Sequence, residues 1–170
     1  MQLIAMATGQ TRTIEMRSSP IQTAYLKTPV SGPCYVHEHG LAGNETAVHP
    51  DAIYAIANEH YEFWANRLGA DRSTWLPGQF AENLTIAGLD ESSLRVGDVI
   101  AIGPDVMLIV TGPHSLFQAR LALRSAGQFR ARVRSFRAQR CLLRRPAARL
   151  DRSRHAGGDC EAGACESDGR

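Results

Sequence analysis

The chain has 170 residues, of which 44% are hydrophobic and 21% charged, and its formal net charge is +2. This length suffices for one domain with a buried core. Its first residues lack the basic region of a signal peptide, and no apolar run approaches the length of roughly 18 residues that a membrane helix needs. We therefore expect a cytoplasmic protein without a membrane partner. The charge is uneven, because residues 1–114 carry 6 Lys/Arg and 12 Asp/Glu, whereas residues 115–170 carry 13 and 5.

Short strands dominate the predicted beginning of the chain. Three are expected, over residues 2–7, 11–16 and 21–26, with a turn between the first two at Thr8-Gly9-Gln10. The segment 27–33 contains two prolines and a glycine, which exclude regular structure. Residues 34–36 then lead into the loop 40–45, whose glycines can bring backbone amides close to a ligand.

A change in the spacing of apolar residues predicts one long helix over residues 51–68. Its apolar residues recur at gaps of three and four, Pro50-Asp51 supplies a start, and Gly69 supplies a stop. Strands follow over residues 79–85 and 99–110, with turns at the intervening glycines. Short strands at this spacing with one helix predict a mainly β fold, a small barrel or sandwich with a helix on its side.

A longer pattern then becomes recognisable, and it consists of Leu76-Pro77-Gly78-Gln79-Phe80-Ala81-Glu82-Asn83-Leu84-Thr85, Gly88-Leu89, Val96-Gly97-Asp98 and Ile102-Gly103. It resembles the MOSC family, named for the C-terminal domain of molybdenum-cofactor sulfurases. The segment 27–33 and the helix around 59–64 are similar to the bacterial branch that includes proteins conferring resistance to N-hydroxylated base analogues. We therefore interpret residues 1–114 as a partial MOSC domain with a β-barrel-like fold.

The resemblance carries functional expectations. It implies binding of the molybdenum cofactor, with reduction of N-hydroxylated compounds or sulfur transfer as the activity. It also implies a small-molecule substrate, a redox partner protein and a pyridoxal phosphate site. Clustered arginines at 120–154 offer a competing interpretation as a nucleic-acid-binding arm. Few aromatic residues are interleaved there, so we expect no nucleic-acid partner.

Candidate cofactor-binding residues follow from the family pattern. Lys27 is the only lysine of the chain, and its place in the pattern suggests a cofactor contact, whereas a lone lysine is ordinarily solvated charge. Glu82 and Asn83 put a carboxylate and an amide at a strand edge, where the asparagine could fix a ligand oxygen or tie its own turn. His49 and Asp51 lie at the start of the predicted helix. The glycines and the lysine of the family pattern are absent beside them, which weakens the case for an anion-binding loop there.

Other polar residues favour structural interpretations. His60 and Trp64 share the apolar stripe of the predicted helix, which favours core packing over a ligand role. His155, Cys160 and Cys165 could ligate zinc, but no paired CxxC knuckle supports such a site, so we expect no metal site of this kind.

The cysteine that the family would place after the strand at 107–111 is missing. Family members are expected to carry a Pro-Cys-Phe-Lys-Leu-Ala loop there, whose thiolate ligates molybdenum or carries sulfur. Here the segment 111–123 contains no cysteine, and the next one is Cys141. The catalytic residue is therefore unknown and the activity is expected to be impaired, the alternative being a non-enzymatic or inactive ligand-binding remnant.

A shifted reading frame would explain this loss. Permitted codons for residues 115–123, read one base later, give Pro-Cys-Phe-Lys-Leu-Ala-Trp-Arg, and those that follow permit Gly-Gln-Pro-Asp-Ser-Phe. We therefore interpret residues 115–170 as an Arg-rich, out-of-frame tail that is poorly ordered and irregular or locally helical. A third interpretation is a genuine amphipathic helix over residues 116–143, since Ala, Leu, Arg and Gln favour helix.

Overall fold

The computed structural model describes residues 1–16, 19–37, 39–45, 53–115, 132–138 and 148–150. One α-helix, α1 (Glu59–Leu68), and one 3-10 helix, η1 (Arg72–Thr74), occur among these residues. The strands are β1 (Gln2–Thr8), β2 (Arg12–Met16), β3 (Ser19–Thr23), β4 (Thr28–Pro29), β5 (Cys34–His37), β6 (Gly40–Leu41), β7 (Ile53–Ala57), β8 (Leu84–Ala87), β9 (Val99–Ile102), β10 (Val106–Ser115), β11 (Arg132–Ala138) and β12 (Ala148–Leu150).

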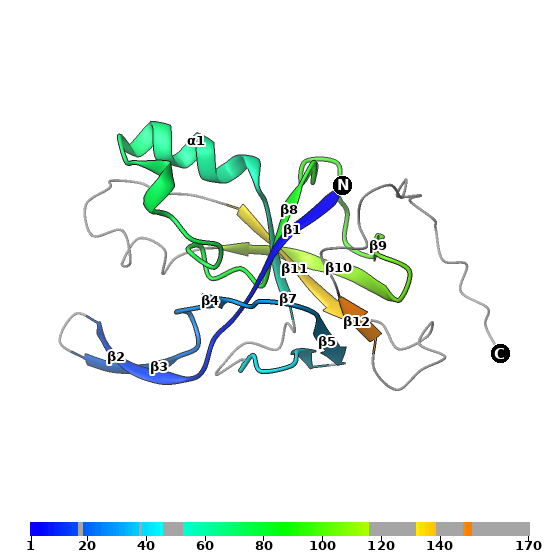
Figure 1. Cartoon of the computed structure of the whole chain (residues 1–170), viewed down its shortest axis with the longest axis horizontal. Coiled ribbons are helices and arrows are strands. Elements are labelled where there is room, and N and C mark those ends of the chain that lie inside the picture. Colours follow the sequence, from blue (N-terminus) through cyan, green and yellow to red (C-terminus); the bar gives the residue numbers. More distant parts are fainter. Residues whose placement is uncertain (17–18, 38, 46–52, 116–131, 139–147, 151–170) are drawn as a thin grey trace.

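Most of these strands form one seven-stranded sheet in the order β4-β1-β8-β7-β11-β10-β9 (Figure 1). Its neighbours are antiparallel except β7 and β8, which run parallel. A three-stranded sheet, β12-β5-β6, and the hairpin β2-β3 complete the described strands. The predicted mainly β fold with a helix is confirmed, although the described strands form an open sheet with β4 and β9 at its edges.

Two hydrophobic clusters cover opposite faces of the large sheet, and β7 contributes to both. Ile53 belongs to the larger cluster, which also contains Cys34 and Val36 of β5, whereas Ile56 belongs to the cluster under α1. Side chains alternate between the faces of a strand, so β7 is buried on both sides. The helix therefore packs on one face and the small sheet on the other, as Figure 1 shows.

The predicted helix begins too early. Residues 53–57 form a strand, and α1 starts only at Glu59 before ending at Gly69, which adopts the left-handed conformation with a φ of 61°. The run Ile-Tyr-Ala-Ile-Ala is apolar at nearly every position, and periodicity alone does not distinguish such a run from a helix. Pairing with β8 on one side and β11 on the other satisfies its backbone as a strand.

Three further expectations need correction. The segment 27–33, in which regular structure was excluded, contains the short strand β4. Residues 79–83 were expected in a strand, but they complete a turn, and β8 begins at Leu84. Within the tail, residues 132–138 and 148–150 form the strands β11 and β12 instead of irregular or helical structure. The rest of the tail lies outside the described residues, as does most of the helix predicted over 116–143. No helix of the described part is long and apolar enough to cross a membrane.

Candidate functional site

Glu82 organises the turn that precedes β8. Its side chain is fully buried, and Oε1 accepts hydrogen bonds from the Gly78 amide at 2.7 Å, the Thr85 hydroxyl at 2.9 Å and the Tyr61 hydroxyl. Oε2 accepts from the Phe80 amide at 3.0 Å. Burial raises the pKa of Glu82, while these hydrogen bonds act in the opposite direction. Because both oxygens are occupied within the chain, Glu82 shapes the site without facing a ligand.

Asn83 links two strands of the sheet. Its Oδ1 accepts a hydrogen bond from the Tyr54 amide at 3.1 Å, and its Nδ2 donates to the Ala7 carbonyl at 3.1 Å. Its backbone groups bond to the same two residues, at 2.7 and 2.9 Å. Both ends of the amide thus have backbone partners at a position that is 1% exposed, and this geometry favours the structural interpretation of Asn83.

Lys27 lies between β3 and β4 with its side chain mostly buried. Its Nζ donates to Asn44 Oδ1 at 2.8 Å, and the described residues place no carboxylate within ion-pair distance of it. Burial lowers the pKa of Lys27 to about 8, although the charge of Glu82 acts in the opposite direction. A mostly buried ammonium whose bonded partner is neutral is poorly compensated, and an anion beside it would favour its charged form.

Gly78 lets the turn of Glu82 pack directly on Lys27. A Cβ at Gly78 would lie 3.1 Å from Lys27 Cβ, Lys27 O and Ala7 Cβ, and its φ of 95° lies in the left-handed region. We predict that Gly78→Ala lowers the free energy of unfolding by about 1–3 kcal/mol, because strain and crowding add. Urea denaturation will measure this loss, with Gly97→Ala as a control, since Gly97 has the same φ but open space around it. Equal losses would mean that crowding against Lys27 contributes nothing.

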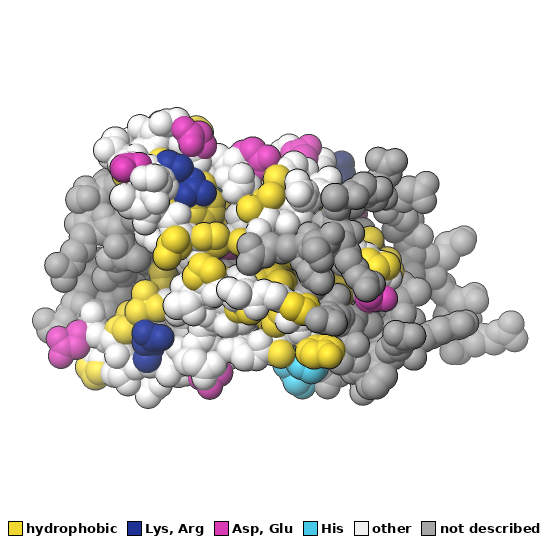
Figure 2. All heavy atoms as spheres, viewed as in Figure 1, with side chains coloured by type: hydrophobic (Ala, Val, Ile, Leu, Met, Phe, Trp, Pro, Cys, Tyr) yellow, Lys and Arg dark blue, Asp and Glu magenta, His cyan; other side chains and the backbone are white. Residues whose placement is uncertain are grey.

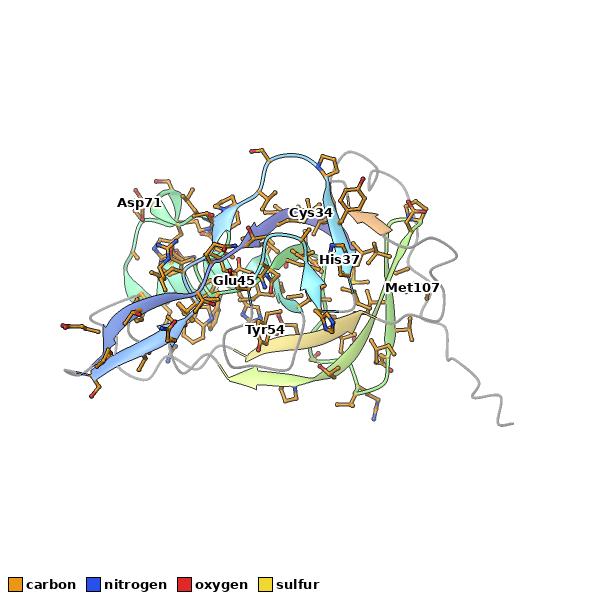
Figure 3. The ribbon with its side chains drawn as sticks, turned by 90° about the horizontal axis from the view of Figure 1, so that it is seen from below. Cys34, His37, Glu45, Tyr54, Asp71 and Met107 are labelled. Carbon is orange, nitrogen blue, oxygen red and sulfur yellow. The ribbon has the colours of Figure 1, made fainter. Side chains whose placement is uncertain are left out.

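The loop at 43–45 docks on the turn after β1. The Glu45 amide donates to the Gly9 carbonyl at 2.8 Å, and Glu45 Oε2 accepts from the Thr11 amide at 2.7 Å. Gln10 Nε2 donates to the Gly43 carbonyl at 2.7 Å. Figure 3 shows Glu45 beside the chain that joins β1 to the β2-β3 hairpin. These contacts fix Asn44, the neighbour of Glu45, against Lys27.

Two buried polar atoms, one on a residue bonded to Lys27 and one on a residue two positions before it in the chain, have no hydrogen-bond partner among the described residues. They are the Asn44 amide nitrogen and the Tyr25 hydroxyl. Burial raises the pKa of Tyr25, and the charge of Glu82 adds to this effect, so the hydroxyl stays protonated and able to donate. Buried donors in folded proteins are nearly always paired, and unpaired ones call for an explanation such as an absent ligand. Lys27 and Asn44, which are in direct contact, therefore make up a candidate site of two donor side chains. Tyr25 packs against the cluster under α1 and is not assigned to this site.

Sequence patterns pointed to Lys27 but gave no sign of Asn44 or of the unpaired Tyr25 hydroxyl. The loop 40–45 had been expected to approach a ligand through its backbone, whereas Asn44 contributes a side chain. Tyr25 gave no signal, because an aromatic residue in a predicted strand reads as core. His49 and Asp51 lie outside the described residues, so their assignment stays a prediction.

Two residues of the predicted helix, Trp64 and His60, were expected to pack in the core. This holds for Trp64, which is 7% exposed in the cluster beneath α1. It does not hold for His60, whose side chain is 31% exposed and whose Nε2 lies 3.4 Å from Glu91 Oε2. The described residues contain no group of three or more His, Cys, Asp or Glu side chains that could hold a metal ion. On the face drawn in Figure 2, the described Lys and Arg side chains are scattered and form no continuous basic stripe.

The family follows from comparison with known proteins. Residues 38–116 match the model of the MOSC domain. This chain carries a MOSC domain. The domain is similar to the protein YiiM of Escherichia coli (strain K12), with 34% identity over 99 residues, which are 55% of this chain and 44% of that protein. The uncharacterized protein YflK of Bacillus subtilis (strain 168) is 28% identical over 113 residues, 63% of this chain and 50% of that protein.

A more distant relative is a protein named reductase from Gibberella moniliformis (strain M3125 / FGSC 7600), 24% identical over 124 residues, 69% of this chain and 22% of that protein. The crystal structure of YiiM from Escherichia coli shares the fold, with a TM-score of 0.60 and 19% identity over 99% of this chain and 72% of that one. YiiM from Geobacillus stearothermophilus gives a TM-score of 0.59 and 21% identity over 89% and 71%. The MOSC chain spans half or less of the length of these curated relatives.

Proposed function

We propose that this MOSC domain binds an anionic small molecule at Lys27, with the molybdenum cofactor as the candidate that the family carries, and that the chain lacks the thiol-dependent part of the chemistry. The observation that carries the proposal is the pair of donors formed by Lys27 and Asn44, whose side-chain amide nitrogen is buried without a partner among the described residues. Donors without acceptors suit the oxygen-rich, negatively charged parts of a cofactor.

The residues present fit the anionic part of that cofactor but not a thiolate bond to its metal. Cys34 is buried, its thiol lies 3.5 Å from the Ala42 carbonyl oxygen, and burial raises its pKa. A thiol in that environment stays protonated, whereas metal binding and sulfur transfer need the thiolate. The sequence has no cysteine over residues 35–140 that could take its place. We therefore assign no reduction or sulfur-transfer step to this polypeptide.

Binding is tested by purifying the protein from cells that synthesise the molybdenum cofactor. We expect bound pterin, detected by fluorescence after oxidation, in the unaltered protein and a loss of at least tenfold in Lys27→Met, because the cationic donor is removed. Arg67→Met, which removes an exposed cation from α1, serves as the matched control and should retain pterin. Equal pterin content in all three proteins, or none in any, would contradict the proposal.

We also propose that residues from about 115 onward come from a shifted reading frame. The match to the MOSC domain ends at residue 116, next to the point where the one-base shift yields a Pro-Cys pair. The sequence of β11 adds support. This strand pairs with β7 on one side and β10 on the other. Alternate positions of a strand belong to opposite faces, and arginines occur in both alternating sets, at 132 and 134 in one and at 137 in the other. A strand in the middle of a sheet ordinarily has an apolar set of positions.

The reading frame gives a direct prediction. Sequencing the gene across codons 108–125 should reveal a Pro-Cys pair when the codons from 115 are read one base later. Expression in that frame should increase soluble yield and pterin content together, because the same segment supplies both closing strands and the loop cysteine. DNA that cannot encode Pro-Cys in that frame would remove the basis of this proposal and leave the tail to be explained as protein sequence.

Three expectations from the sequence stay predictions at this stage. They are the cytoplasmic location, the redox partner protein and the binding of pyridoxal phosphate. If the frame proposal holds, reduction of N-hydroxylated compounds belongs to the restored protein, and the present polypeptide retains ligand binding alone.

A further inference from the structure

The orientation of the Asn44 amide is fixed by its neighbours. Its Oδ1 lies 3.1 Å from the Gly9 amide nitrogen and 2.8 Å from Lys27 Nζ, both of which are donors. Only an oxygen satisfies two donors, so the amide nitrogen must occupy the other end of the planar group. That nitrogen is buried and bonds to nothing in the described part of the chain.

The loop cannot easily turn this nitrogen toward another acceptor. The backbone N–H of Asn44 donates to the Leu41 carbonyl at 3.0 Å. The next residue, Glu45, donates through its backbone N–H to the Gly9 carbonyl and accepts through its carboxylate from the Thr11 amide. Gly9 itself is tightly packed, since a Cβ there would lie 2.6 Å from the Ala24 carbonyl oxygen and 3.2 Å from Lys27 Cγ. The unpaired donor is therefore held in place by the surrounding backbone.

We propose that Asn44 is a specificity-determining residue of the Lys27 site, whose amide nitrogen donates to an oxyanion of the ligand beside the lysine ammonium. The inference rests on the proposed function and narrows it, because an amide nitrogen accepts no hydrogen bond and rejects a ligand group that presents a donor. The ligand class is thus one with a phosphate, carboxylate or similar oxyanion.

Asn44→Asp separates this role from a structural one. The new carboxylate keeps an oxygen for the Gly9 amide and for Lys27, but it replaces the donor nitrogen by a negatively charged acceptor. Gln22→Glu makes the same chemical change on the exposed face of the β2-β3 hairpin and serves as the control.

Because Lys27 is the only lysine, protein labelled with 13C-lysine gives a single reporter for a titration with inorganic phosphate against chloride at equal ionic strength. We expect saturable shifts of the Lys27 signal and of the Asn44 side-chain amide in the unaltered protein. Asn44→Asp should weaken phosphate binding by about tenfold or more, whereas Gln22→Glu should leave it unchanged.

The outcomes distinguish the two proposals. The role of Asn44 would be overturned if phosphate binding requires Lys27 but is unchanged in Asn44→Asp. It would also be overturned if phosphate leaves the Asn44 side-chain amide signal unshifted. In both cases the proposed site at Lys27 would stand. Phosphate shifts of the same size in Lys27→Met, followed through backbone amides, would overturn both. The amide readout uses the unaltered protein, so it remains decisive if Asn44→Asp fails to fold.

Discussion

Replacing Lys27 by methionine is expected to stabilise the protein by about 2 kcal/mol at pH 7. A fall in the lysine pKa from 10.5 to about 8 corresponds to a cost of about 3 kcal/mol for keeping the buried charge at neutral pH. Loss of the hydrogen bond to Asn44 offsets about 1 kcal/mol of the gain. A substitution that stabilises the fold while removing ligand binding is the behaviour expected of a functional residue.

The pH dependence of this gain has a definite sign. The folded-state pKa of Lys27 lies below its unfolded value, so the unfolded chain binds more protons between pH 8 and pH 10.5. The stability of the unaltered protein should therefore rise across that window relative to Lys27→Met, and the advantage of the variant should shrink. Urea denaturation of both proteins at pH 7 and pH 9.5 measures the difference. A variant less stable than the unaltered protein at pH 7 would identify Lys27 as a structural residue.

Glu82→Gln should destabilise the fold by about 2 kcal/mol despite its nearly unchanged shape. The carboxylate accepts hydrogen bonds at both oxygens, and a glutamine must present its amide nitrogen to one set of donors, either Phe80 N or the group around Gly78 N. The donor that loses its acceptor stays buried and unpaired. Glu62→Gln, on the exposed side of α1, should change stability by less than about 0.5 kcal/mol.

Chemical denaturation at pH 7 compares the two glutamine variants directly. We further expect Glu82→Gln to weaken pterin binding, because the turn it holds packs on Lys27 through Gly78. Equal stability of both variants would show that the buried carboxylate is not needed to hold the turn.

Local patterns predicted the strands well and the site only in part. The first two strands and the strands on either side of the turn at 103–105 carry their turn residues within a few positions, so sequence was sufficient to locate them. Sequence did not give the partners of the first two, since β1 pairs with β4 and β8 and β2 pairs with β3. The start of α1 was misplaced because residues 53–57 are apolar on both faces, and whether they form helix or strand depends on β8 and β11. That pairing is tertiary information, which overrides local propensity.

Glu82 and Asn44 illustrate why side-chain roles were harder to predict. Sequence predicted Glu82 as a cofactor-binding candidate, but its carboxylate turns inward to amides of its own turn. Asn44 acquires its role from Gly9 and Lys27, which lie 35 and 17 positions away in the chain. Hydrogen bonds over such separations leave no local pattern in a single sequence.

The pairing of β1 with β8 also sets the order in which the protein can fold. Ala7 exchanges hydrogen bonds with Asn83, 76 positions later, and β1 has β4 as its other neighbour in the sheet. During synthesis the first strand must therefore wait for β8 to emerge from the ribosome before most of its edge is covered. Such non-local topology slows folding and prolongs exposure of an unpaired strand. Nascent chains from which β8 has not yet emerged should consequently depend on chaperones, whatever the sequence of the tail.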